Sequence, residues 1–452
     1  MPELGPSPLA ASDRDLSVDE ARAAIARALA PISGSESVPL SQALGRVLAA
    51  DVISPIDVPA HDNSAMDGYA FAGSALQASG ATLLSCVGSV LAGAPSSAAV
   101  AAGACVRITT GAVMPDGTDT VVPEELCRSN GATVSIEPGV IATGDNRRRR
   151  GEDLGSGRPA LRRGRVLRPA DLGLLASLGI DHASVMRRLR VALFSTGDEL
   201  RQGGQPLDPG CIYDSNRASL QAAVQRLGME VVDLGLVADD PAALQATLAM
   251  AVAQADVVLT SGGVSVGEAD HTRAVLARMG EVAFWKVAMR PGRPFAFGPL
   301  KRAGDLPPTW LFALPGNPVA ALVTFYVFAR EALMQLAGAT PEPLPVLQAR
   351  CSTAIRKRPG RTEFQRAVVE RKPSDSVAGE LADGRGSGAK GNSGNSGGSS
   401  GSSGWQVRLT GSQGAGVLRS MSEANALLVL RHEQGSVEAG DLVDVWLFDG
   451  LV

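Results

Sequence analysis

Hydrophobic and polar positions alternate regularly between residues 187 and 340 of this chain. Apolar runs such as 190–197 and 256–263 are separated by segments with apolar residues at helical spacing, such as 241–254. Apolar strands that alternate with amphipathic helices are typical of a parallel sheet with helices on both faces. This pattern predicts an α/β domain.

The pattern outside this region is different. Residues 17–32 begin with Ser and an acidic first turn, which predicts a helix. Between 56 and 145, short β-rich pieces alternate with Gly/Pro turns, and 162–180 has a strand-turn-helix pattern. The chain is β-rich again after 341, apart from a Gly/Ser-rich stretch at 384–404. That stretch cannot bury a core and is predicted to be a flexible insertion.

These patterns predict several domains, because 452 residues exceed the size of one ordinary domain. The predicted fold class is α/β plus β, with a central parallel-sheet α/β domain, a β-rich domain and a C-terminal β domain. The predicted boundaries are a discontinuous helical or mixed domain at 14–55 and 146–182, a β-rich domain at 56–145, the α/β domain at 183–340 and the C-terminal domain at 341–452.

The composition argues against several classes of function. The net charge of −4 and the pI of about 5.7 argue against a chain-wide electrostatic footprint for nucleic acid. The five cysteines are widely spaced without a C-x-x-C pair, so neither a zinc site nor a disulfide framework is expected. The N-terminus does not resemble a signal peptide, and the apolar run at 319–329 is too short to span a bilayer. We expect a cytoplasmic protein without nucleic-acid or membrane partners.

Carboxylates follow two of the predicted strands. Asp198 and Glu199 come directly after 190–197, and a Gly-rich segment with two acids occupies 260–270. In open parallel sheets, ligands bind outside the carboxyl ends of the strands. Glycines allow close backbone approach, and N–H groups ahead of a helix favour an anion. Since carboxylates repel phosphate, the combination indicates a phosphate or similar oxyanion bridged by Mg²⁺, with a plain polar turn as the alternative.

Basic residues gather in two other stretches. Lys286, Arg290 and Arg293 surround a Pro-Gly turn, and such cations suit the oxygens of phosphate or molybdate. The alternative is a solvated basic turn. Residues 146–153 place four arginines beside two acids, which indicates a surface salt-bridge cluster. The histidines lack metal-ligand spacing: His61, His182, His271 and His432.

Together, these stretches resemble the molybdopterin molybdenumtransferase family, which includes the gephyrin E domain. The resemblance covers nearly the whole chain from about residue 14, apart from the Gly/Ser insertion. The matching motifs are DNSAMDGYA (62–70), RITTGAVMPDGTD (107–119), NRRRRGED (146–153), VALFSTGDEL (191–200), YDSNR (213–217), TSGGVSVGEADHT (260–272), MRPGRPFAFG (289–298), LPGNPVAALVTF (314–325), GRTEFQRA (360–367) and LTGSQGAGVLRSMSEANALLVL (409–430).

The resemblance implies a transferase that inserts molybdate into the dithiolene of adenylated molybdopterin and releases AMP and the molybdenum cofactor. It also implies an elongated homodimer of four-part subunits, with the site at the subunit interface. The family's important carboxylates fall on Asp67, Asp153, Glu199, Asp239 and Asp270. Glu199 and Asp270 would organise Mg²⁺ and the adenylate phosphate, while Asp67 and Asp153 would complete the site from the other subunit.

The resemblance also implies a set of substrate-binding residues. Three would form a phosphate cradle, three would hold pterin phosphate or molybdate, and two are prolines of the segment between a strand and a helix. In that order they are Ser261, Gly262, Gly263, Lys286, Arg290, Arg293, Pro315 and Pro318.

Two departures from the family pattern concern oxyanion binding. Family members often have lysines where this chain has Arg290 and Arg293, and a planar guanidinium is a different donor from an ammonium group. Ala320 replaces a serine common in the family, which removes one hydroxyl donor. The alternative functions are molybdopterin adenylylation by ATP and a non-catalytic, gephyrin-like scaffold. Molybdopterin adenylyltransferase and molybdoenzyme-maturation proteins are the expected partners.

Overall fold

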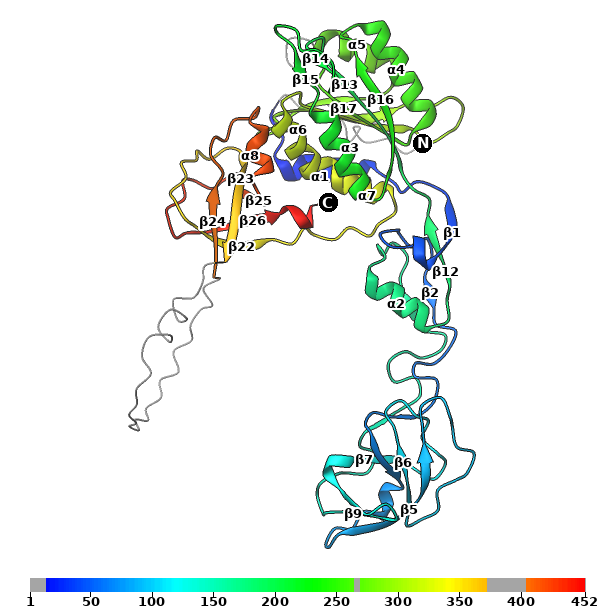
Figure 1. Ribbon diagram of the computed structural model, residues 1–452. Helices are drawn as coiled ribbons and strands as arrows, with labels where there is room; N and C mark the ends of the chain where they lie inside the picture. The colour runs from blue at the N-terminus through cyan, green and yellow to red at the C-terminus, as the bar shows by residue number, and fades with distance from the viewer. Residues whose placement is uncertain (1–13, 264–268, 372–403, 452) are drawn as a thin grey trace, which may run out of the picture. The chain divides into compact units, whose positions relative to one another are not determined.

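In the computed structural model, residues 14–263, 269–371 and 404–451 are described, and they form two units (Figure 1). The large unit contains residues 14–36, Gly45–Val47 and everything described from Met186 onward. The small unit contains Ser37–Leu44 and Leu48–Val185. The four domain boundaries expected from the sequence subdivide these units and remain a prediction.

The large unit contains a central sheet with the strand order β16-β13-β17-β21-β20-β18. The first four strands are parallel, as predicted, whereas β20 and β18 are antiparallel to their neighbours and make the sheet mixed. The physical reason is connection length, since a parallel crossover needs about a dozen residues and both 287–293 and 301–308 are shorter. The strands are β13 (Arg190–Thr196), β16 (Glu230–Val237), β17 (Val257–Ser261), β18 (Ala283–Lys286), β20 (Pro294–Leu300) and β21 (Thr309–Leu314).

Helices follow these strands as the alternating pattern predicts. Helices α4 and α5 bury Leu248 and Leu276 against one sheet face, together with Phe194 of β13 and Leu311 of β21. The helices of the α/β region are α3 (Asn216–Arg226), α4 (Pro241–Gln254), α5 (Ala269–Met279), α6 (Pro318–Thr324) and α7 (Arg330–Leu336). Strand β20 was missed by the pattern, because its sequence was interpreted only as part of a Pro-Gly turn.

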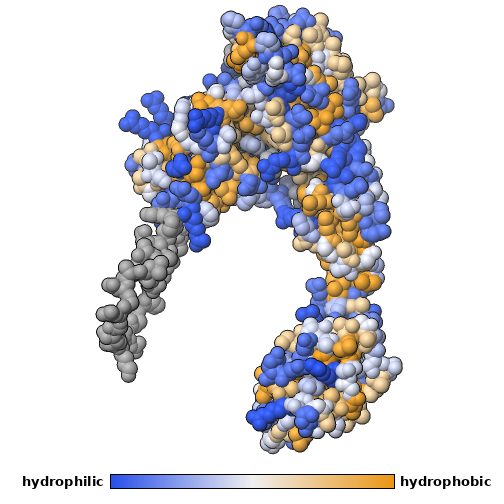
Figure 2. Space-filling view, in the orientation of Figure 1, coloured by the Kyte–Doolittle hydropathy of each residue, from blue (hydrophilic) through white to orange (hydrophobic). Residues whose placement is uncertain are grey.

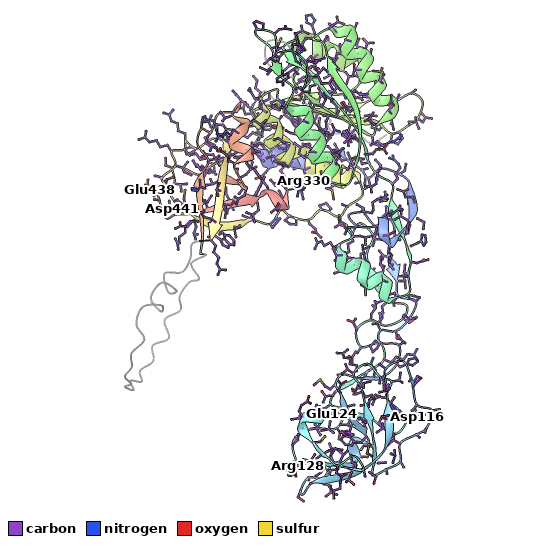
Figure 3. All side chains as sticks on the ribbon, viewed as in Figure 1. Asp116, Glu124, Arg128, Arg330, Glu438 and Asp441 are labelled. Carbon is purple, nitrogen blue, oxygen red and sulfur yellow. The ribbon has the colours of Figure 1, made fainter. Side chains whose placement is uncertain are left out.

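A π-helical turn, Phe325–Ala329, joins α6 to α7. Among the described residues, the combined segment Pro318–Leu336 is the one helix long and apolar enough to cross a membrane by length and composition. The most apolar window of this helix is 72% buried inside the protein, and a core helix of a globular domain shows the same burial. Its Arg330 donates to the carbonyl oxygens of Gly450 and Leu451 near the C-terminus (Figure 3).

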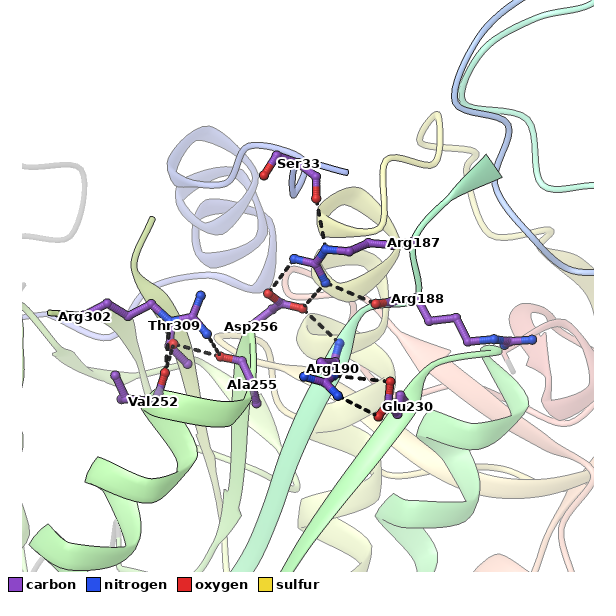
Figure 4. A network of polar contacts seen from close by, with 10 residues as sticks. All are labelled: Ser33, Arg187, Arg188, Arg190, Glu230, Val252, Ala255, Asp256, Arg302 and Thr309. Carbon is purple, nitrogen blue, oxygen red and sulfur yellow. Dashed lines mark hydrogen bonds and ion pairs between the residues drawn. The ribbon is translucent and has the colours of Figure 1, made fainter. Parts of the chain in front are cut away.

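The amino ends of β13 and β17 are joined by a buried carboxylate (Figure 4). Asp256 is 7% exposed and accepts hydrogen bonds from both terminal nitrogens of Arg187, each at 2.8 Å, and from the backbone N–H of Arg190. Burial opposes ionisation, but these hydrogen bonds and the Arg187 charge hold the pKa of Asp256 below its usual value. Arg187 also donates to the Ser33 carbonyl oxygen. The opposite, carboxyl ends of the strands carry the predicted site loops.

The C-terminal part of the large unit is a closed sheet. Strand β23 pairs with β24 and also with β25, so the order β23-β24-β22-β26-β25 returns to its start. Ala349, Leu428 and Val445 are among the residues of its core. This confirms the predicted C-terminal β domain. Its elements are β22 (Leu347–Cys351), β23 (Thr362–Arg371), β24 (Trp405–Leu409), α8 (Leu418–Ser422), β25 (Ala426–Leu430) and β26 (Leu442–Leu447), and β19 (Met289–Arg290) pairs with β23.

The small unit contains a sheet with the order β7-β4-β6-β5-β9-β8, which confirms the predicted β-rich region. Its strands are β4 (Gly68–Phe71), β5 (Thr82–Val90), β6 (Ala104–Ile108), β7 (Thr120–Pro123), β8 (Arg128–Ser129) and β9 (Thr133–Ile136). The unit also contains α2 (Pro169–Ser177) and paired short strands, which are β2 (Val52–Ile53), β3 (Asn63–Ser64), β10 (Arg147–Arg148), β11 (Pro159–Leu161) and most of β1 (Ser35–Pro39) and β12 (His182–Met186).

Helix α1 (Val18–Ala28) begins where the sequence predicts it. The Ser17 hydroxyl accepts from the Glu20 N–H, and the Glu20 carboxylate accepts from the Ser17 N–H, which is a capping box. The helix ends at Ala28, before the predicted end at residue 32, because Leu29 has extended backbone and Pro31 follows.

Candidate active site

The loop after β13 positions Glu199 over Gly197. A Cβ atom at residue 197 would lie 2.5 Å from Oε2 of Glu199, so the carboxylate lies directly beside the Gly197 backbone, whose φ of +151° favours glycine. Asp198 and Glu199 are both exposed, and Oδ1 of Asp198 accepts from the Asp239 N–H at 3.1 Å. Because Asp239 follows β16, this bond holds two of the predicted carboxylate loops side by side.

The ends of β17 and β21 are joined by Asn216, the first residue of α3. Its Nδ2 donates to Oγ of Ser261 and to the Gly316 carbonyl oxygen, both at 2.6 Å. Ser261 is 2% exposed, and its hydroxyl donates to the Pro315 carbonyl oxygen at 3.4 Å. Ser261 therefore fixes the loop rather than facing solvent. The motif YDSNR contains Asn216, but the sequence did not assign it this role.

Gly262 and Gly263 bring their backbone against the end of β13. Gly262 has a φ of +95°, and a Cβ atom there would lie 2.5 Å from the Thr196 carbonyl oxygen and 2.8 Å from Oγ1 of Thr196. Gly263 has a φ of +69°. Both positions thus require glycine, as expected for a chain that approaches a ligand closely. Pro318, at the first position of α6, has the structural role typical of a helix start.

A cavity of about 210 Å³ opens between these loops at the carboxyl edge of the sheet. Asp239 and Gly263 were predicted as site residues, whereas the other lining residues were not. The cavity is lined by Thr196, Ala238, Asp239, Asp240, Pro241, Leu244, Gly263, His271 and Thr272. Among the described residues, Thr196 and Thr260 have buried Oγ1 atoms without a hydrogen-bond partner. Of the two, Thr196 lines this cavity, and an unpaired buried hydroxyl at a cavity is suited to a ligand or water.

Part of the predicted site lies in residues that the structure does not describe. Asp270 is the second residue of α5, but its side chain, like residues 264–268, lies outside the described part of the chain. The predicted pairing of Glu199 with Asp270 therefore remains a prediction. Glu199 itself is exposed, as a ligand-binding carboxylate must be.

The basic turn lies against α6. A Cβ atom on Gly292 would collide with Oγ1 of Thr324, and Ala320 is 3% exposed beside it. Arg293 is exposed and forms a two-pronged ion pair with Asp15, at 3.0 and 3.1 Å. Lys286 and Arg290 are also exposed.

A buried arginine lies close to this turn and was not predicted. Arg366 of β23 is 1% exposed and donates to the carbonyl oxygens of Ser412 and Gly414 and to the Ser420 hydroxyl. Burial and, to a smaller extent, the positive charge of Arg290 lower the pKa of Arg366 to about 10. The two guanidinium groups therefore make this region electropositive.

Asp67 and Asp153 belong to the small unit, and both are exposed. Oδ1 of Asp67 accepts from the N–H of Thr110 at 2.6 Å and from its hydroxyl at 2.9 Å. These two bonds, the backbone one first, hold the pKa of Asp67 below its usual value. The Asp153 N–H donates to the Val58 carbonyl oxygen at 3.1 Å.

The salt-bridge interpretation of the arginine run is confirmed for Arg147 and Arg150. Arg147 pairs with Asp62, and Arg150 pairs with Asp57 at 2.6 Å. The Glu152 carboxylate accepts from the Arg149 backbone N–H instead of from a guanidinium group. The ion-pair partners of Arg147 and Arg150 thus come from an earlier segment of the chain, which the spacing within the motif could not predict.

The described residues contain no group of three or more His, Cys, Asp or Glu side chains that could hold a metal ion. The carboxylates at the sheet edge are hard oxygen donors, and Mg²⁺ is commonly held by one or two carboxylates together with substrate phosphate. Exposed Glu199 and Asp239 beside the glycine backbone fit this kind of shared site. They do not fit a site built by the protein alone.

Three segments of the chain match known protein families. Residues 16–179 match the MoeA N-terminal region (domain I and II), residues 192–335 match a family described as probable molybdopterin binding domain, and residues 400–448 match the MoeA C-terminal region (domain IV).

Curated relatives match over most of the chain. The molybdopterin molybdenumtransferase of Haemophilus influenzae is 38% identical over 97% of this chain and 100% of the relative. Molybdopterin molybdenumtransferase 2 of Mycobacterium tuberculosis is 36% identical over 93% of this chain and 96% of the relative. Gephyrin of Dictyostelium discoideum is 31% identical over 75% of this chain and 47% of that protein.

Solved structures agree with these matches. The crystal structure of the molybdopterin biosynthesis moeA protein from Pyrococcus horikoshii OT3 covers 96% of this chain and 100% of its own, with 25% identity and a TM-score of 0.76. A molybdenum cofactor biosynthesis protein from Pyrococcus furiosus has a TM-score of 0.55 at 21% identity, covering 96% of this chain and 100% of its own, and supports the fold alone.

Proposed function

This chain belongs to the molybdopterin molybdenumtransferase family, and from that premise we propose that it inserts molybdate into adenylated molybdopterin with release of AMP. The single observation that carries the assignment to the site is the cavity at the carboxyl edge of the sheet. There the glycine backbone after β17 and the Asp239 loop meet, so a nucleotide phosphate can approach both N–H donors and carboxylates.

The residues at this edge of the sheet would have two roles, which are to bind the adenylate phosphate and to hold the Mg²⁺ that offsets its charge. The backbone at Gly262 and Gly263, at the end of β17, would bind the adenylate phosphate. Ser261 and Asn216 would hold that backbone in place through their hydrogen bonds. Glu199 and Asp239 would hold Mg²⁺, which supplies positive charge against the phosphate when bound. Asp270 would join them from α5.

The oxyanion substrate would be attracted by the electropositive region around the basic turn. Arg293 is already paired with Asp15, so Lys286 and Arg290 are the exposed cations better placed to accept molybdate. Arg366 is buried and close enough to Arg290 for their charges to interact, so it adds positive charge beneath the surface. Guanidinium groups suit the tetrahedral oxyanion because they donate two parallel hydrogen bonds.

Three further features belong to the proposal. We place the protein in the cytoplasm, and we expect it to work as a homodimer in which Asp67 and Asp153 complete the partner's site. The sister reaction, adenylylation of molybdopterin by ATP, shares the α/β fold and would release pyrophosphate instead of AMP. A scaffold without activity would retain the fold but would not need the exposed carboxylates at the sheet edge.

The test is incubation of the full chain with adenylated molybdopterin, molybdate and Mg²⁺, with AMP as the readout. We expect Glu199→Ala and Asp270→Ala to abolish AMP release, and chelation of Mg²⁺ to do the same reversibly. Asp208→Ala is the matched control, because Asp208 is an exposed carboxylate of the same loop region whose partner is Arg201 at 3.6 Å. No AMP above a protein-free control would refute the transferase assignment.

A further inference from the structure

Three of the five cysteines come together in the small unit, although they are widely spaced in the sequence. Cys105 lies in the core of the β sheet with Phe71 and Val134, and Cys86 and Cys127 pack against the same hydrophobic cluster. All three are free thiols in this structure. Nothing in the proposed transfer reaction uses them.

Two of these thiols lie directly opposite each other. Cys86 of β5 and Cys105 of β6 are register partners on adjacent parallel strands. Adjacent strands are about 4.8 Å apart, which lies within the Cα separation of roughly 4.4–6.8 Å that disulfides adopt. The Cys86 thiol is also close enough to the Cys105 thiol to contribute to the raised pKa of Cys105, after burial. The pair can therefore be joined with only a small adjustment of the two strands.

The two thiols have different reactivities. Burial, and then the neighbouring Cys86 and Cys127, raise the pKa of Cys105 to about 12, and its side chain is fully buried. Tyr69 is the other titratable member of the cluster. Cys86 is only half-buried, and its Sγ donates a weak hydrogen bond to the Gly88 carbonyl oxygen at 3.6 Å. A reagent from solution would therefore meet Cys86 first, since reactivity needs access and thiolate character.

Cys86 and Cys127 have different surroundings. Leu83 and Val87, on the same strand as Cys86, are exposed. Figure 2 shows apolar residues on the surface of this unit. Cys127 follows a short helical turn, and its Sγ donates to the carbonyl oxygen of Glu124, which is labelled in Figure 3. Within the described sheet, Cys127 does not belong to a strand that pairs with β6.

We propose that Cys86 and Cys105 form a reversible thiol-modification site, which a small disulfide of the glutathione class oxidises to an intramolecular disulfide. In the first step, the Cys86 thiolate attacks one sulfur of the oxidant, forming a mixed disulfide and releasing one reduced thiol. In the second step, Cys105 loses its proton and its sulfur attacks Sγ of Cys86, releasing the second reduced thiol. The protein loses two hydrogens and the oxidant gains them.

The same site can influence the transfer reaction, a consequence that rests on the proposed function. Strand β6 leads directly to Thr110, whose N–H and hydroxyl hold the Asp67 carboxylate. A disulfide fixes its two Cβ atoms at about 3.8 Å, so oxidation would make a small shift of β6 relative to β5. Asp67 would move with it, and displacement of a positioned group lowers the rate.

The experiment treats the folded full-length protein with glutathione disulfide, stops exchange by acid quench, unfolds the protein in the presence of a thiol-blocking reagent and counts the blocked thiols. We expect the count to fall from five to three, with peptide mapping that joins Cys86 to Cys105, and dithiothreitol to restore all five. Cys105→Ala should stop at a glutathione adduct on Cys86, and Cys86→Ser should resist oxidation. Cys211→Ser, in the large unit, is the matched control and should still lose two thiols.

Three results would overturn the inference. They are an unchanged thiol count, a glutathione adduct on Cys86 that never resolves in the wild type, and a disulfide to Cys127. AMP release is measured separately, and we expect it to fall on oxidation and to recover with dithiothreitol, with no such response in Cys105→Ala. Reduced wild type that releases no AMP would refute the proposed function but leave the disulfide standing. A disulfide without any loss of AMP release would remove the link to Asp67.

Discussion

Replacing Gly262 by alanine tests the claim that the glycine backbone after β17 forms the phosphate-binding part of the site. The added Cβ would lie 2.5 Å from the Thr196 carbonyl oxygen, whereas ordinary contacts begin at 3.4 Å, so the two loops must separate by about 0.9 Å. The positive φ of +95° costs roughly a further 1–2 kcal/mol for an alanine.

The expected result follows from these two numbers. A misplacement of about 1 Å at a catalytic site costs on the order of 100-fold in rate, so AMP release should fall by about that factor. Stability should also fall, because the roughly 1–2 kcal/mol of backbone strain lowers the melting temperature by a few degrees and the clash with Thr196 adds to it. The assay is AMP release at saturating molybdate, with thermal unfolding of the same sample measured in parallel.

Gly316→Ala is the matched control, since its nearest neighbour is the Gly262 Cα atom at 3.8 Å. It lies in the same site, and alanine fits there without a close contact. We expect AMP release close to that of the wild type. The reasoning fails if Gly262→Ala also releases AMP at the wild-type rate, or if both variants lose activity to the same extent.

Three more predictions follow from the hydrogen bonds and burial of single residues. Asn216→Ala removes two hydrogen bonds of 2.6 Å, and denaturant unfolding should show a loss of about 1–3 kcal/mol together with slower AMP release. Asp256→Asn leaves Arg187 unpaired and should cost about 3 kcal/mol. Because the pKa of Asp256 is lowered in the folded state, its stabilisation is present above about pH 4 and is lost on acidification, so acid titrations should be steeper for the wild type than for this variant. Cys105 has a raised pKa of about 12, so the folded state should lose stability as the pH rises from 9 toward 12, and alkaline unfolding of Cys105→Ala should lack this component.

The sequence predicted the α/β region well, because its strands and helices are long and periodic. Buried strands such as β17 and helices such as α4 contain nearly continuous or regularly spaced apolar residues. Strand β20 was missed because its first residues, Pro294 and Phe295, follow a Pro-Gly turn and lack alternation. Its antiparallel direction follows from the shortness of two connections, which is a topological property that no local pattern reports.

The candidate site was predicted in part, for a similar reason. Glycines and carboxylates that follow strands indicate the carboxyl edge, and the structure places Glu199, Gly262 and Gly263 at that edge, while their roles remain predictions. Asn216 and Arg366 were not, because an amide that bridges two loops and a guanidinium that binds carbonyl oxygens depend on neighbours distant in the chain.

The cysteines are a clearer example of a contact between distant residues that the sequence could not predict. Sequence spacing gave no reason to pair Cys86 with Cys105, since there are eighteen residues between them and no recognised motif. Their contact depends on β5 and β6 being neighbours in register, which only the folded sheet defines. The expectation that no disulfide framework exists concerns permanent cross-links. It is compatible with a cysteine pair that is normally reduced and forms a disulfide only when an oxidant such as glutathione disulfide is present.

The closed ring of strands in the C-terminal part has a practical consequence. Its strands β23 and β24 are antiparallel neighbours, and the chain that joins them runs from Arg371 to Trp405. Every strand of the ring keeps two neighbours whatever that connection contains, and each doubling of a loop costs only about 0.6 kcal/mol. A foreign peptide or a small reporter domain could therefore be grafted between these two residues without opening the barrel.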